Sequence, residues 1–73
     1  MGTKEQNEWA LKHFAIMDET AQGVVKELYK VRTMTGPLLQ LKMDELFSPL
    51  GMPRWAEWAI REVAAYLPEE WTN

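Results

Sequence analysis

Residues 10–31, ALKHFAIMDETAQGVVKELYKV, decide the fold of this chain. Apolar side chains recur there at alternating intervals of 4 and 3 residues, the spacing of one face of an α-helix. A stripe of this kind is buried against other elements, so it predicts a helical protein with this stretch at its core. The stripe, called the seam below, consists of Ala10, Phe14, Met17, Ala21, Val24, Leu28 and Val31.

Signals on both sides of the seam predict a helix over residues 4–34. Thr3 and Gln6 have the spacing of a capping box at its start, and Gly36-Pro37 ends it. At 1.5 Å per residue this helix would be about 46 Å long, more than so small a chain can cover. Either the helix breaks near residues 18–23, or it protrudes and a second chain covers part of it. The seam stays in phase across that stretch, which favours continuity.

Two shorter helices are predicted after the turn. Residues 37–47 are apolar nearly all round and begin with proline, which suits a first helical position, so we expect this helix to be the most buried. A third helix is predicted over residues 53–67, followed by a tail at 68–73 in which only Trp71 is expected to be ordered. The apolar face of the third helix is expected to hold Trp55, Ala59, Ile60, Val63, Tyr66 and Leu67. Within it, Trp55, Ala59, Val63 and Tyr66 are expected to form the inward stripe.

Length and composition place the chain among small all-α domains of two or three helices. It has 73 residues and no cysteine, so we expect one domain with a thin core and neither a disulfide nor a cysteine zinc site. No apolar run approaches the roughly 20 residues of a membrane span. The first residues lack the apolar segment of a signal peptide. These features indicate a cytoplasmic protein.

The net charge of −3 is unevenly distributed. Residues 1–36 carry equal numbers of acidic and basic groups, whereas residues 37–73 carry the whole negative excess. Acidic surfaces disfavour nucleic-acid phosphates and anionic lipids, so neither is expected as a direct ligand. Lys26, Lys30 and Arg32 form a small basic group, interpreted as a solvated helix face because glutamates interleave with it.

No group of residues has the pattern of a catalytic centre. His13 is the only histidine, and no neighbouring residue is placed to orient it as a general base. The adjacent carboxylates Asp44-Glu45 and Glu69-Glu70 would point in different directions on a helix. The glycines are too scattered for a phosphate-binding loop. We therefore expect no enzyme, no cofactor and no metal site.

Residues 45–54, ELFSPLGMPR, resemble the middle of a helix-turn-helix DNA-binding motif, in which a leucine and a glycine precede the second helix. The resemblance implies that the second helix would present Arg54 and Arg61 to DNA. Two departures oppose this. Pro49 stands where the first helix should continue, and Glu57 stands where an apolar residue should fix the second helix.

Tryptophan is the most distinctive residue of the chain, with four copies at positions 9, 55, 58 and 71. A thin core has few places for side chains this large. We therefore expect one or two of them to stay exposed in the monomer, where tryptophan and arginine commonly anchor protein interfaces. The alternative is that all four complete the core. Arg54, Trp58 and Arg61 share one helical stripe and are, with Trp71, the predicted partner-binding residues.

The function that these patterns favour is a small non-enzymatic regulator that binds a larger protein. A partner with a basic groove would suit the acidic half of the chain, as in host transcription or nucleic-acid machinery. By analogy of size alone, the chain is typical of phage or mobile-element regulators. Two alternatives stay open: a DNA-binding repressor or excisionase-like protein using residues 38–67, and a structural dimer through residues 10–31.

Overall fold

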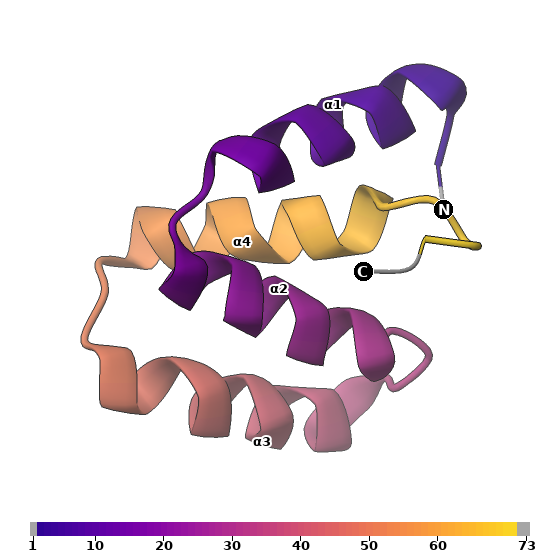
Figure 1. Ribbon diagram of the computed structural model, residues 1–73. Coiled ribbons are helices and arrows are strands. Elements are labelled where there is room, and N and C mark those ends of the chain that lie inside the picture. Colours follow the sequence, from indigo (N-terminus) through magenta and orange to yellow (C-terminus); the bar gives the residue numbers. More distant parts are fainter. Residues whose placement is uncertain (1, 72–73) are drawn as a thin grey trace.

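The computed structural model describes residues 2–71, and within them the chain is entirely helical (Figure 1). The elements are α1 (Lys4–Ile16), α2 (Glu19–Lys30), α3 (Gly36–Phe47), a 3₁₀ turn η1 (Ser48–Leu50) and α4 (Arg54–Tyr66). The all-α class is therefore confirmed. There are four α-helices in the described residues rather than the two or three predicted.

The helix predicted over residues 4–34 is two helices, so the continuity favoured by the seam is wrong. Met17 ends α1 with an extended backbone (φ −74°, ψ 152°). Asp18 then begins α2, and its carboxylate accepts a hydrogen bond of 2.8 Å from the backbone N–H of Ala21. Aspartate is among the best residues for such a cap. The described chain extends 31 Å along its longest axis, so an unbroken helix of about 46 Å would have protruded from it.

The break lets both halves of the seam reach one core. Ala10, Val24 and Leu28 are buried, and Phe14 packs against them from the end of α1. Gln22 fixes the corner between the helices, because its side-chain amide donates a 2.8 Å hydrogen bond to the carbonyl of Phe14. The two halves of the seam thus contribute to one core, in which Ala10, Val24 and Leu28 are buried while the other seam residues stay half-buried.

α4 is the central helix. It packs against both α1 and α2, and α3 lies on the other side of α2 (Figure 1). The inward residues of α4 are Ile60, Val63 and Ala64, with Leu67 just beyond its end. Trp55 and Ala59, which were predicted to face inward, are exposed. Ile60, Val63 and Leu67 of the predicted apolar face are buried, as expected. At 3.6 residues per turn, the buried stripe is rotated by about a quarter turn from the predicted stripe of Trp55, Ala59, Val63 and Tyr66.

α3 is not the most buried helix, contrary to the prediction. Only Met43 and Phe47 of α3 are buried, while Leu38 and Leu41 are each 62% exposed. The reason is that α3 contacts the rest of the described chain on one side, mainly through α2 and η1. Its outward leucines therefore have nothing to pack against.

The C-terminal segment folds back over the core. The ring of Trp71 meets those of Phe14 and Tyr29 edge-on, with centroids 5.1 Å and 5.0 Å away. The hydroxyl oxygen of Tyr29 lies 2.6 Å from the carbonyl of Pro68 and 2.7 Å from that of Glu69, in position to donate to either. Trp71 is therefore ordered, as predicted. Residues 72–73 of the predicted tail lie outside the described residues.

Candidate protein-binding surface

The outward side of α4 carries two exposed tryptophans. Trp55 is 74% exposed and Trp58 is 54% exposed. At 100° per residue, both lie on the side of the helix opposite Ile60, which faces the core. Two tryptophans are therefore substantially exposed, as predicted, although Trp55 was assigned to the core; Trp9 is also 36% exposed.

Arg61 lies directly against Trp58. Its guanidinium carbon is 4.4 Å from the centre of the Trp58 ring, a distance typical of a cation–π contact. The predicted stripe thus becomes a real contact for two of its three residues. Arg54, also exposed, is the first residue of α4 and lies one turn before Trp58 on the same side.

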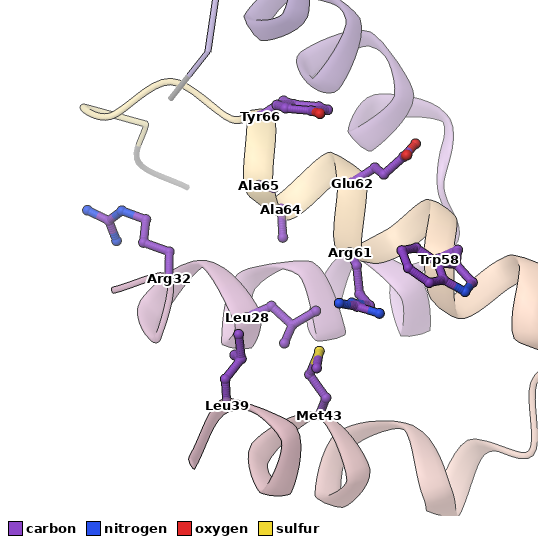
Figure 2. Close-up of a pocket in the computed structure, with 10 residues that line it drawn as sticks. All are labelled: Leu28, Arg32, Leu39, Met43, Trp58, Arg61, Glu62, Ala64, Ala65 and Tyr66. Carbon is purple, nitrogen blue, oxygen red and sulfur yellow. The ribbon is translucent and has the colours of Figure 1, made fainter. Parts of the chain in front are cut away.

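A groove of about 330 Å³ separates the outward side of α4 from α3, and α2 forms its floor (Figure 2). Trp58 and Arg61 line the α4 wall, and Arg32 lies at the opposite end. The apolar part of the lining is made by Leu28, Leu39, Met43, Ala64 and Ala65. We call Arg54, Trp55, Trp58 and Arg61 together with this groove the α4 surface.

Both guanidinium groups of the groove rest on aromatic rings rather than on carboxylates. Arg32 lies 4.0 Å from the centre of the Tyr29 ring and donates a 2.8 Å hydrogen bond to the Tyr29 carbonyl. Within residues 2–71 the only ion pair joins Lys30 to Glu27, at 3.0 Å. The hydrogen bond and charge of Lys30 lower the pKa of the Glu27 carboxyl. Neither groove arginine is thus neutralised within the described chain.

Trp71 lies apart from the other predicted partner-binding residues. Arg54 opens α4, whereas Trp71 follows the end of that helix and is half-buried against the core. The groove lining, in contrast, was missed by sequence reasoning, which assigned Arg32 to a solvated face. The surplus of leucine and methionine in residues 37–47 was the available signal, because one helix face cannot bury them all.

His13 contacts Trp9, which lies one helical turn before it. Its Nδ1 lies 2.9 Å from the carbonyl oxygen of Trp9, and its ring centroid lies 4.4 Å from that of Trp9, with the two planes tilted by 32°. Among residues 2–71, no three histidine, aspartate or glutamate side chains gather where they could hold a metal ion. None of the helices described is long and apolar enough to cross a bilayer.

The turn that resembles a helix-turn-helix motif is formed by η1 and Gly51. Gly51 has a left-handed backbone (φ 60°), a conformation that favours glycine. The helix that follows is α4, and its outward side offers two tryptophans beside the two arginines and Glu62.

No protein-family model matches this chain, and neither a curated protein nor a solved structure matches it significantly.

Proposed function

We propose that this chain is a small non-enzymatic regulator that acts by binding a larger protein through the α4 surface. The observation that carries this proposal is the exposed Trp58 ring, which lies beneath the Arg61 guanidinium at the edge of an apolar groove. Tryptophan and arginine are the residues most enriched at the energetic centres of protein interfaces. A rigid aromatic side chain beside a groove can also bind with little loss of conformational freedom.

The exposed apolar area around α4 supports the same function. Trp55 and Trp58 leave two large apolar side chains of α4 in water, and Trp58 lines the groove. Isolated exposed apolar residues are common on proteins, but two neighbouring tryptophans beside a groove are typical of a binding surface.

The proposed partner carries a basic surface that faces the carboxylates of α3 and α4, such as Glu62, rather than the arginines of the α4 surface. The chain has a net charge of −3, and the excess lies in residues 37–73, which include α3 and α4. Complementary charge accelerates association and excludes partners of the wrong sign. Proteins of transcription or nucleic-acid machinery have such basic surfaces. The proposed role is therefore that of a phage or mobile-element regulator that binds one of them.

Affinity capture from a cell extract with the full chain as bait tests the proposal. Trp58→Ala should lower the affinity for the captured protein by about 30-fold or more, the effect expected at an interface hot spot. Ile16→Ala is the matched control, because Ile16 is a highly exposed apolar residue on α1. Equal capture by both variants, with helical content unchanged, would contradict a role for the α4 surface.

A further inference from the structure

A second depression lies on the other flank of α4, towards α1. Its volume is about 390 Å³, and it is lined by Glu5, Gln6, Trp9, Glu62 and Tyr66. Glu62 and Tyr66 also line the groove described above, so the two hollows meet at these residues. Figure 2 shows both side chains on the side of α4 that faces α1. We call this depression the α1–α4 pocket.

The aromatic walls of the α1–α4 pocket contact each other and a neighbouring histidine. Trp9 meets Tyr66 edge-on, with ring centroids 6.3 Å apart and planes at 73°. The His13 ring lies 4.4 Å from the Trp9 ring, with the two planes tilted by 32°. The side-chain amide of Asn7 donates a 2.7 Å hydrogen bond to the carbonyl of Tyr66, which ties α1 to the end of α4. The rings are therefore ordered before any ligand arrives.

The polar walls of the pocket are two carboxylates and one amide. Glu5 and Glu62 are exposed, and neither belongs to the single ion pair found within residues 2–71. Gln6 is already engaged, because its Oε1 accepts a 2.9 Å hydrogen bond from the backbone N–H of Thr3. The pocket thus offers two aromatic rings and two carboxylates without a cation.

This combination favours a planar cation. Aromatic faces attract a guanidinium or ammonium group, and a guanidinium stacks on a ring while its N–H groups donate to carboxylates. The chain itself contains one example of a guanidinium over an aromatic ring, because Arg61 lies over Trp58. Glu62 lies one turn after Trp58 on α4, so the α1–α4 pocket adjoins the α4 surface.

We propose that the α1–α4 pocket receives an arginine side chain from a basic segment of the partner. This inference rests on the proposed function and specifies the chemistry of its partner. Trp9 and Tyr66 contact the guanidinium plane and the alkyl stem, while Glu5 and Glu62 accept its N–H groups. The partner's other side chains then reach the α4 surface across Glu62.

The test is titration of the full chain with the capped tripeptide Gly-Arg-Gly, followed by the indole N–H signals in two-dimensional NMR spectra. Trp9→Phe identifies the Trp9 signal. The arginine peptide should shift this signal saturably at millimolar concentration. The same peptide with citrulline, which has nearly the same shape but no charge, should bind at least ten-fold more weakly. The Trp58 signal is followed in parallel, because Trp58 lines the groove but not the α1–α4 pocket, and a larger shift at Trp58 than at Trp9 would overturn the pocket's role.

Glu62→Gln should lower the affinity for the arginine peptide about five-fold, because one carboxylate is removed. For the same reason, added salt should weaken binding to this variant less. Glu69→Gln, a change in the C-terminal segment, is the matched control and should leave binding unchanged. Equal binding of the arginine and citrulline peptides, or no saturable shift, would overturn the pocket's role. Stronger binding of spermidine than of the arginine peptide would also overturn it, since the site would then hold free cations.

The two proposals fail separately. If Trp58→Ala no longer captures the partner while Glu62→Gln and Trp9→Leu capture it fully, the pocket proposal is refuted and the α4 surface proposal is supported. Arginine-peptide binding that depends on Glu62, combined with capture that is indifferent to Trp58, would refute the α4 surface as the partner's main contact.

Discussion

Arg61 covers Trp58 at 4.4 Å, although nothing in the described chain requires either side chain for the core. The contact shields part of the indole from water and restricts its rotation. It also keeps the guanidinium beside the apolar groove between α3 and α4. A ring held outward in this way can bind a partner with little further ordering.

Trp58→Ala should therefore leave the free energy of unfolding nearly unchanged, by about 0.5 kcal/mol or less, as is usual for exposed positions. Val63→Ala, on the inward side of the same helix, should be clearly destabilising because Val63 is 1% exposed. Urea unfolding followed by circular dichroism measures both. A loss of stability in Trp58→Ala as large as in Val63→Ala would show that the indole belongs to the core.

Asp18 is expected to determine where α1 ends and α2 begins. Replacing it with alanine removes the hydrogen bond to the N–H of Ala21 and should destabilise the fold by about 1 kcal/mol. Asp18→Asn, which retains a capping oxygen, should recover most of that loss. Thermal unfolding of the three proteins measures the difference. Full stability in Asp18→Ala would mean that packing alone fixes the corner.

The corner shows how far the sequence could predict the fold. The capping box at Thr3, Pro37 in the first turn of α3 and the turn before α4 are local signals, and each is present in the structure. Gly36-Pro37 do not stop the preceding helix as predicted, because α2 already ends at Lys30. The break at Asp18 depends on a competition between the in-phase seam and the small size of the core. The periodicity could not decide between one helix and two. When both helices pack against α4, their apolar residues show the same 4 and 3 spacing as one continuous helix would.

The surface depended still more on tertiary packing. The Arg54-Trp58-Arg61 stripe could be predicted from spacing, since residues i, i+4 and i+7 share a helix face. The orientation of Trp55 could not, because the predicted and true inward stripes of α4 contain similar numbers of apolar residues. The groove depends on how α3 packs against α2, which no local pattern encodes.

Leu28 and Leu38 are expected to differ sharply in their effect on stability. Leu28 is 6% exposed within the core, so Leu28→Ala should cost about 2–5 kcal/mol. Leu38 projects into solvent from α3, and Leu38→Ala should change stability by only about 0.5 kcal/mol. Parallel denaturant titrations provide the measurement. Similar losses for the two variants would indicate that α3 packs against the chain through its outer side.

Tyr29→Phe should release the C-terminal segment without disturbing the core. The ring remains, but the hydroxyl that lies beside the carbonyls of Pro68 and Glu69 is lost, at a cost of about 0.5–1.5 kcal/mol. Amide hydrogen exchange at residues 68–71 should become faster, while exchange within α2 stays slow. Unchanged exchange at the segment would mean that the Trp71 ring alone holds it in place.

Arg54→Glu should separate protein binding from the DNA-binding alternative. Arg54 is exposed at the start of α4, where a helix-turn-helix protein would contact DNA, so reversing its charge should leave the fold intact. If α4 entered a DNA groove, the variant would bind every duplex more weakly and with a shallower salt dependence. We instead expect no duplex binding by either protein in electrophoretic and fluorescence assays at low salt. We also expect weaker capture of the protein partner by the variant, because Arg54 borders Trp58. Duplex binding by the natural chain that disappears in Arg54→Glu would replace the protein-binding proposal with the DNA-binding one.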